Sequence, residues 1–267
     1  MTIEVGFLGY GRMAQAISEG LDRSGAVPYE RQAASDIASE TLLDLAEKRG
    51  FSAQPDNRSL LAQSPVVIIA VKPHQVLAAL NQDKQALDRQ LFISIAAGVT
   101  LADLKQWLPP QAKVIRVIPN LPALVGRGVS LICAPEETAE EHLAQARSIF
   151  QSVGVTVDLD ERRFDEGTAV SGSGPAYFFL IMEALIRGAV RLGLTWETAR
   201  ELVLRVAQGA AETALAHPEL SLADLRDQVT SPGGTTAEAL WVLEDGAITA
   251  LLQRALLAAT AKAKKLT

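Results

Sequence analysis

The chain has 267 residues, of which 48% are hydrophobic and 21% are charged, and its formal net charge is −6. Such a composition supports a real core, in one large domain or two modest ones. Because acidic residues exceed basic ones and no long basic run occurs, neither nucleic acids nor anionic membranes are expected as partners.

The sparse cysteines and histidines point to a metal-free cytoplasmic protein. The one cysteine, Cys133, excludes a disulfide within the chain, and His74, His142 and His217 are too scattered to predict a metal site. The apolar runs fall well short of the ~20 residues of a membrane-spanning helix. The first residues carry no basic leader, so a signal peptide is not expected either.

Short β-like runs alternate with helical stretches over residues 1–160. Strands joined through helices predict βαβ units, a parallel sheet and an α/β Rossmann-like domain. The run 66–71 is continuously apolar and β-branched, as in a strand covered on both faces. The predicted strands cover residues 3–8, 66–71, 91–95, 114–118, 129–133 and 155–159, with a further strand ending near residues 33–36.

A glycine-rich motif follows the first predicted strand. Gly9, Gly11 and Ala14 have the spacing G-x-G-x-x-[GA], and a helical pattern comes next. In a dinucleotide-binding loop the first glycine permits a tight turn, the second lets the pyrophosphate approach the backbone, and the third small residue lets helix and strand pack. The phosphates then face the helix N-terminus. A plain strand-to-helix turn is the alternative, but the motif's place at the start of a βαβ series favours the dinucleotide.

The end of the second predicted strand bears on the choice of dinucleotide. An acidic residue there binds the ribose 2′-hydroxyl of NAD, whereas a basic residue nearby favours the 2′-phosphate of NADP. Asp36 leans towards NAD, and Ser35 is neutral. Arg12 and Arg31 are alternative sources of positive charge, so the residues leave both cofactors open. Asp36 has the alternative role of a helix cap.

The pattern becomes helical after about Asp160, and no strand is expected from Phe164 onward. Residues 161–267 are therefore predicted to form a second, all-α domain. Helical spacing covers residues 177–192, 199–210, 235–243 and 247–261.

One helix start in this region predicts an anion site. Gly233 and Gly234 precede a helical run that begins with two threonines. Thr235 is the predicted N-cap of a capping box, which leaves the hydroxyl of Thr236 free at the first helical position. Two glycines expose backbone N–H groups at the positive end of the helix, which suits a carboxylate.

No lysine occurs between Val114 and Ala261. Many alcohol-oxidising relatives of this architecture use a lysine or histidine of the second domain as acid or base, and here only His217 is available. An imine substrate would not need such a residue. A protonated iminium is already electrophilic, so hydride transfer to it depends on the position of the reactants more than on a strong base.

Six motifs resemble those of the pyrroline-5-carboxylate reductases, in that family's order. They are Gly9-Tyr10-Gly11, Ala70-Val71-Lys72-Pro73, Ala96-Ala97-Gly98-Val99, Pro119-Asn120, Ser171-Gly172-Ser173-Gly174-Pro175-Ala176-Tyr177 and Ser231-Pro232-Gly233-Gly234-Thr235-Thr236. The last two are specific, whereas the first is shared with many dehydrogenases. The resemblance implies reduction of the C=N bond of 1-pyrroline-5-carboxylate to L-proline, the last step of proline biosynthesis, with NADPH or alternatively NADH as hydride donor.

The resemblance also implies residue roles. Thr236 is the expected catalytic residue near the imine nitrogen, with Ser231, Gly233, Gly234 and Thr235 around the substrate. The helical domain is expected to dimerise, giving a homodimer or a larger ring of dimers. The residues expected to contact the cofactor are Leu8, Gly9, Tyr10, Gly11, Arg12, Met13, Ser35, Asp36, Asn57, Ala70, Val71, Lys72, Pro73, Ala96, Ala97, Gly98 and Asn120.

Two other functions remain open from the sequence. One is another imine reductase, or a β-hydroxyacid-type NAD(P) oxidoreductase, although the missing second-domain lysine counts against the latter. The other is a non-enzymatic module that senses NAD(P). The second anion site counts against a sensor, because a sensor needs no such site.

Overall fold

The computed structural model describes residues 2–81, 87 and 90–265. By compactness the chain divides into two units, one reaching Gly172 and including the chain end from Thr260, the other running from Ser173 to Ala259. The first unit therefore extends beyond the predicted division after residue 160 by the helix α7 (Phe164–Ser171), which packs on the sheet. An ion pair of 3.1 Å between Lys264 Nζ and Glu166 Oε1 holds the end of the chain to the same helix.

The first unit contains an eight-stranded sheet, and every predicted strand is present in it. The strand order is β3-β2-β1-β4-β5-β6-β7-β8. The chain runs outward from β1 in one direction and then returns to β4 on its other side, so the topological switch point lies between β1 and β4. The strands are β1 (Val5–Leu8), β2 (Gln32–Ser35), β3 (Ser52–Ala53), β4 (Val66–Ile69), β5 (Leu91–Ser94), β6 (Lys113–Ile118), β7 (Gly128–Cys133) and β8 (Gly154–Asp158).

The sheet differs from the predicted one in two places. β6 and β7 pair antiparallel, whereas all the other neighbouring strands pair parallel. Between them lies only the 3₁₀ helix η4 (Leu121–Val125), and a parallel crossover needs a dozen residues or more. The short edge strand β3 was not predicted, since two residues carry no periodic pattern.

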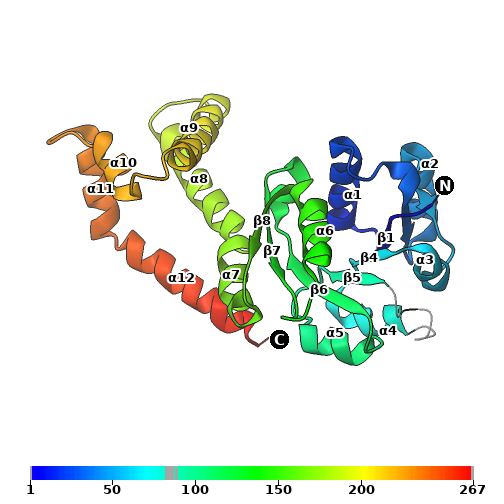
Figure 1. Ribbon diagram of the computed structural model, residues 1–267. Coiled ribbons are helices and arrows are strands. Elements are labelled where there is room, and N and C mark those ends of the chain that lie inside the picture. The colour runs from blue at the N-terminus through cyan, green and yellow to red at the C-terminus, as the bar shows by residue number, and fades with distance from the viewer. Residues whose placement is uncertain (1, 82–86, 88–89, 266–267) are drawn as a thin grey trace. The chain divides into compact units, whose positions relative to one another are not determined.

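Helices cover both faces of the sheet, which explains the unbroken apolar strands. In β4, Val66 and Ile68 belong to one core cluster and Val67 and Ile69 to the other. The first cluster is completed by α1 (Arg12–Ser24), α2 (Ser39–Arg49) and α6 (Glu140–Gln151) (Figure 1). The second is completed by α3 (Asn57–Gln63), α4 (Val76–Leu80), α5 (Leu101–Trp107) and α7. The described residues also form the 3₁₀ helices η1 (Tyr29–Arg31), η2 (Pro73–Gln75) and η5 (Glu161–Arg163).

The second unit is helical, as predicted, and no strand follows β8 in the described residues up to 265. Its helices α8 and α9 pack against each other, yet Ile186 and Ala199 are the only hydrophobic residues of this unit that are fully buried among those described. The helices are α8 (Gly174–Arg191), α9 (Trp196–Ala216), α10 (Leu222–Gln228), α11 (Thr235–Asp245) and α12 (Ile248–Ala263).

One helical stretch, Glu161–Arg191, is long and apolar enough to cross a membrane by length and composition, and 17% of its most apolar window is buried. The short apolar runs in the sequence did not predict this stretch. Most of this window is therefore apolar surface that the chain itself does not cover.

Candidate active site

A cavity of about 450 Å³ opens at the carboxyl ends of β1, β2 and β4. This is the topological switch point, where ligands bind in open parallel sheets. Its walls come from segments far apart in the sequence. They are Gly9, Gly11, Ser35, Asp36, Ile37, Asn57, Ala70, Val71, Lys72, Gln75, Ala78 and Ala79.

The glycine-rich loop has the shape that its sequence predicts. Gly9 has a φ of +90°, and a side chain there would come within 2.8 Å of Val71. The loop is tied to its neighbours, because Gly9 N–H donates to Ser35 O at 2.8 Å and Ala70 N–H donates to Leu8 O at 2.8 Å. Gly11 is the N-cap of α1, and the position of its missing Cβ faces open space. The start of a 13-residue helix thus meets the cavity at Gly11, and a helix N-terminus is suited to receive an anion.

The middle residue of the motif is part of the scaffold. The side chain of Tyr10 is 4% exposed, and its ring lies 4.6 Å from that of Phe51. Its hydroxyl forms a hydrogen bond of 2.7 Å with Ser18 Oγ. Burial raises the pKa of Tyr10, while Ser18 and Arg49 lower it by smaller amounts. The ring and hydroxyl of Tyr10 therefore belong to the scaffold, and Tyr10 does not line the cavity.

The end of β2 carries a second group of polar side chains. Ser35 is buried and donates its hydroxyl to Asn57 Oδ1 at 2.9 Å. Asp36 accepts the N–H of Tyr10 at 2.7 Å and that of Ala38 at 2.9 Å. The alternative role of Asp36 as the N-cap of α2 is wrong, because Ala38 occupies the N-cap position and no side chain caps the N–H groups of this helix. Asp36 accepts the N–H of Ala38 itself, which precedes the helix.

The structure brings together about half of the predicted cofactor residues. Those that line the cavity are Gly9, Gly11, Ser35, Asp36, Asn57, Ala70, Val71 and Lys72. Those that do not line it are Leu8, Tyr10, Arg12, Met13, Pro73, Ala96, Ala97, Gly98 and Asn120. Ala96 to Gly98 still follow β5 at the same edge of the sheet, where Ile95 N–H donates to Ile69 O at 3.0 Å.

Both amide atoms of the Asn120 side chain form hydrogen bonds within the first unit. Its Oδ1 accepts the N–H of Val129 at 2.8 Å, and its Nδ2 donates to Ser171 O at 2.9 Å. The residue is buried and joins the ends of β6 and α7. Its contact with a cofactor stays a prediction.

Sequence reasoning missed four residues that line the cavity. Ile37 directly follows Asp36, and Gln75, Ala78 and Ala79 lie in η2 and α4. Their spacing of three and four residues places them on one side of a helical turn. That periodicity, starting just after Pro73, was a signal that could have found them.

The predicted substrate turn belongs to the second unit, and one part of its prediction is wrong. Gly234, with φ −83° and ψ 170°, is the N-cap of α11, and no side chain caps this helix. Thr235 is therefore the first helical residue and Thr236 the second. The capping box does not form, because the glycine already has the extended conformation that precedes a helix.

The two glycines of this turn have local steric reasons. Gly233 has a φ of +69°, which a residue with a side chain rarely adopts. A Cβ on Gly234 would lie 2.3 Å from Ser231 Oγ. Gly234 N–H donates to Ser231 O at 3.0 Å, which closes the turn. The geometry leaves Thr235 exposed and Thr236 half-buried at the start of α11.

Comparison with known proteins covers the whole chain. The family described as "Pyrroline-5-carboxylate reductase dimerisation" matches residues 161–266, and the one described as "NADP oxidoreductase coenzyme F420-dependent" matches residues 4–98. A pyrroline-5-carboxylate reductase of Pseudomonas aeruginosa is 39% identical over 99% of this chain and 97% of its own length. The chain belongs to the pyrroline-5-carboxylate reductase family. An Arabidopsis thaliana reductase is 37% identical over 99% of this chain and 96% of its own length.

Solved reductase structures have the same fold. The pyrroline-5-carboxylate reductase of Coxiella burnetii has a TM-score of 0.92 at 39% identity, covering 100% of this chain and 99% of its own. That of Plasmodium falciparum, solved with NADP bound, has a TM-score of 0.88 at 30% identity, covering 99% and 98%. The resemblance inferred from the six motifs is thereby confirmed.

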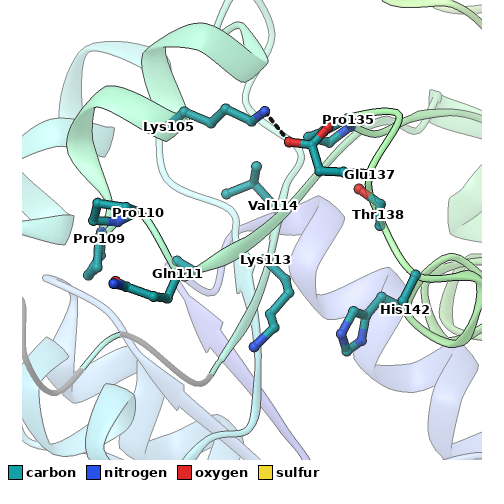
Figure 2. Close-up of a pocket in the computed structure, with 12 residues that line it drawn as sticks. Lys105, Pro109, Pro110, Gln111, Lys113, Val114, Pro135, Glu137, Thr138 and His142 are labelled. Atoms are coloured by element: carbon teal, nitrogen blue, oxygen red, sulfur yellow. Dashed lines mark hydrogen bonds and ion pairs between the residues drawn. The ribbon is translucent and has the colours of Figure 1, made fainter.

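Two other features lie apart from this site. A cavity of about 500 Å³ lies beside the ion pair of Lys105 and Glu137, whose Nζ and Oε1 atoms are 2.7 Å apart. The residues around it are drawn in Figure 2, and none of the predicted site residues lines it. Cys133 lies in β7, and burial raises the pKa of its thiol to about 12. The thiol is therefore protonated at neutral pH and unsuited to nucleophilic chemistry.

Proposed function

We propose that this chain reduces 1-pyrroline-5-carboxylate to L-proline with a reduced nicotinamide dinucleotide, NADPH or NADH. The observation that carries the proposal is the similarity to pyrroline-5-carboxylate reductases along the whole chain, at 39% identity. The cavity at the switch point supports it, because its glycine loop and open Gly11 suit a pyrophosphate.

The first unit holds the cofactor in this proposal. Accessible N–H groups at the start of α1 bind the pyrophosphate, and the polar group after β2 faces the adenosine ribose. When bound, the dinucleotide supplies a hydride to the imine carbon. The C=N bond becomes a single bond, and the nitrogen keeps the proton of the iminium, so the product is the secondary amine of proline.

The second unit contributes the substrate turn. The turn at Gly233 and Gly234, with Ser231 beside it, presents the free backbone N–H groups at the start of α11 to the substrate carboxylate, while the N–H of Gly234 closes the turn by donating to Ser231 O. The hydroxyl of Thr236 orients the iminium nitrogen and is the catalytic residue of the proposal, and Thr235 contributes its backbone. Orientation matters most here, because an iminium needs no further activation to accept hydride.

We also propose that a second copy of the chain covers the helical unit, as a homodimer or a ring of dimers. Large apolar side chains on its helices are exposed, among them Phe178, Leu180 and Trp241. Monomeric proteins rarely leave so much apolar surface in contact with water. The same cover would account for the apolar stretch Glu161–Arg191. The low cysteine content supports a cytoplasmic location in this proposal. The negative net charge supports the absence of nucleic-acid and membrane partners.

Substrate selectivity tests the function. Purified protein should consume NADPH or NADH when 1-pyrroline-5-carboxylate is added, measured as the fall in nicotinamide absorbance, and proline should accumulate. β-Hydroxyacids with the oxidised cofactor should give no reaction. Turnover of β-hydroxyacids without proline formation would instead support the β-hydroxyacid alternative, and cofactor binding without any turnover would support the sensor.

A further inference from the structure

We infer that Arg116 and Glu161 are positioning residues for hydride transfer, because together they hold the loop that meets the nicotinamide half of the cofactor. The inference rests on the proposed function and deepens it. The two side chains form an ion pair, with 2.9 Å between Arg116 Nη1 and Glu161 Oε1. Arg116 lies in β6, and with 3% of its side chain exposed it is the most buried cation in any ion pair of the described residues.

The carboxylate of Glu161 links Arg116 to the loop of residues 96–100, here called the β5 loop. Oε1 of Glu161, which binds Arg116, also accepts the N–H of Leu101 at 2.8 Å. Leu101 is the first residue of α5 and directly follows the β5 loop. Leu101 and Glu161 are 60 residues apart in the sequence. The end of the β5 loop is therefore held from a distant part of the sheet unit.

The other hydrogen bonds of the β5 loop are local. Val99 N–H donates to Ala96 O at 3.4 Å, and Thr100 N–H donates to Asp103 Oδ2 at 2.9 Å. These bonds fix the shape of the loop and join it to α5, but they do not fix where the loop and the start of α5 lie on the sheet. Among the hydrogen bonds of the described residues, the one from Leu101 to Glu161 has that effect.

The β5 loop lies where the second half of the dinucleotide has to pass. In the proposed function the pyrophosphate lies at Gly11 after β1, and the adenosine ribose lies after β2. The two halves extend in opposite directions from the pyrophosphate across the carboxyl ends of the strands. On the other side of β1 come β4 and then β5, so the nicotinamide half meets the β5 loop. A misplacement of about 1 Å at the reacting atoms can lower the rate by ~10²-fold.

Arg116 is fixed on its other side by an aromatic ring. Its guanidinium carbon lies 4.8 Å from the centroid of Phe164, which is fully buried in α7. A cation over the face of a ring is attracted to it. In the sheet, Arg116 pairs in register with Ser94 of β5 and Cys133 of β7, so its backbone is held on both sides. The ring and the two strands thus give Glu161 a rigid partner.

Stability alone does not call for this ion pair. A buried ion pair can often be replaced by apolar side chains of similar volume without loss of stability. Arg116 Nε is buried and has no hydrogen-bond partner among the described residues, so the guanidinium is not fully satisfied where it lies. A carboxylate can accept the N–H of Leu101, whereas an apolar side chain cannot. This acceptor is what the pair provides for the β5 loop.

Two ligands that reach different parts of the site test the inference. 2′,5′-ADP occupies only the adenosine part, whereas NADPH also reaches the β5 loop. Their dissociation constants are measured by calorimetry and fluorescence titration, kcat is measured with 1-pyrroline-5-carboxylate, and stability is measured by urea denaturation.

The double variant Arg116→Met/Glu161→Leu removes both charges and the acceptor, and it should unfold close to the unaltered protein. Its kcat should fall at least ~10-fold and its NADPH affinity should also fall. Its affinity for 2′,5′-ADP should stay within about twofold, because the adenosine part does not touch the loop.

Three further variants separate positioning from stability. Arg116→Met/Glu161→Gln also lacks both charges, but its amide oxygen can accept the N–H of Leu101, so it should turn over faster than the variant with leucine. Glu161→Leu alone leaves a buried cation unpaired and should be the least stable of the set. Arg147→Met is the matched control, because Arg147 pairs with Asp158 at 2.6 Å in the same unit and has no bond to the β5 loop. It should leave kcat and both affinities unchanged.

Three outcomes would overturn the inference. They are an unchanged kcat in a folded Arg116→Met/Glu161→Leu, equal losses of affinity for NADPH and 2′,5′-ADP, or equal turnover of the glutamine and leucine double variants. Absence of proline from every protein, the unaltered one included, would instead refute the proposed function. The comparison of the two ligands would still decide whether the pair positions the β5 loop for the cofactor.

Discussion

The sheet unit and the helical unit differ in how far each is complete by itself. The sheet has a core on both faces, with Phe7, Phe92 and Phe150 fully buried. In the helical unit, α10, α11 and α12 contain no fully buried residue among those described, while Phe178 and Trp241 are each 67% exposed. The first unit has the interior of a finished domain, whereas the second exposes large apolar side chains. The same kind of residue should therefore have different effects in the two units.

The largest effect is expected in the core of the sheet unit. Phe92→Ala in β5 removes a buried ring and leaves a cavity, which should lower the free energy of unfolding by about 3–5 kcal/mol. Urea denaturation measures it. The loss should not depend on protein concentration, and a concentration-dependent loss would show that the sheet unit also relies on assembly.

The next effect separates the chemistry of the two units. Thr236→Ala should lower kcat/KM for the imine by roughly 10- to 100-fold, about 1.4–2.7 kcal/mol, because one hydrogen bond at the reacting nitrogen is lost. Cofactor affinity should barely change. Thr235→Ala is the matched control, and because Gly234 is the N-cap it should change stability by less than about 0.5 kcal/mol. The assignment fails if Thr235→Ala loses turnover and Thr236→Ala does not.

The converse change lies in the sheet unit. Gly11→Val fills the open space at the start of α1 and should weaken cofactor binding by at least ~10-fold, or ~1.4 kcal/mol. Because nothing lies within 4 Å of the added Cβ, the fold should tolerate it. Gly25→Ala at the other end of α1 should lower stability, because its φ of +73° strains a side chain, yet leave cofactor binding normal, which separates a damaged helix end from a blocked loop. Near-normal binding by fluorescence titration of Gly11→Val would show that the loop is only a turn.

The smallest effect is expected from an exposed phenylalanine of the helical unit. Phe178→Ala in α8 should raise the dissociation constant of the dimer by ~10-fold, about 1.4 kcal/mol, through lost interface area. Analytical ultracentrifugation over a dilution series measures it. A monomeric unaltered protein at micromolar concentration would refute the second copy as the cover of this face.

Much of the sheet unit could be predicted because burial on both faces leaves a plain sequence pattern. The run 66–71 is apolar throughout, and β4 is indeed shared by the two cores. The antiparallel direction of β7 left no such pattern in the sequence, since β7 is about as buried as the parallel strands. The short connection through η4 was the available signal.

The site was predictable where a residue type is dictated by the backbone. Gly9 needs its positive φ and Gly11 its open approach, and both lie in the cavity. Thr235 was misplaced by one residue, because the sequence cannot show which of several small polar residues adopts the extended N-cap conformation. Two features of the scaffold could not be predicted, because folding alone brings their partners together. They are the hydrogen bonds of Asn120 to Val129 and Ser171, and that of Tyr10 to Ser18.

The transfer of a labelled hydride tests the central claim most directly. NADH or NADPH with deuterium at both positions of the nicotinamide C4 is mixed with the protein and 1-pyrroline-5-carboxylate, and the proline formed is examined by mass spectrometry. The account predicts proline carrying one deuterium, at the former imine carbon. No proline from folded protein with either cofactor, or proline without the label, would contradict it.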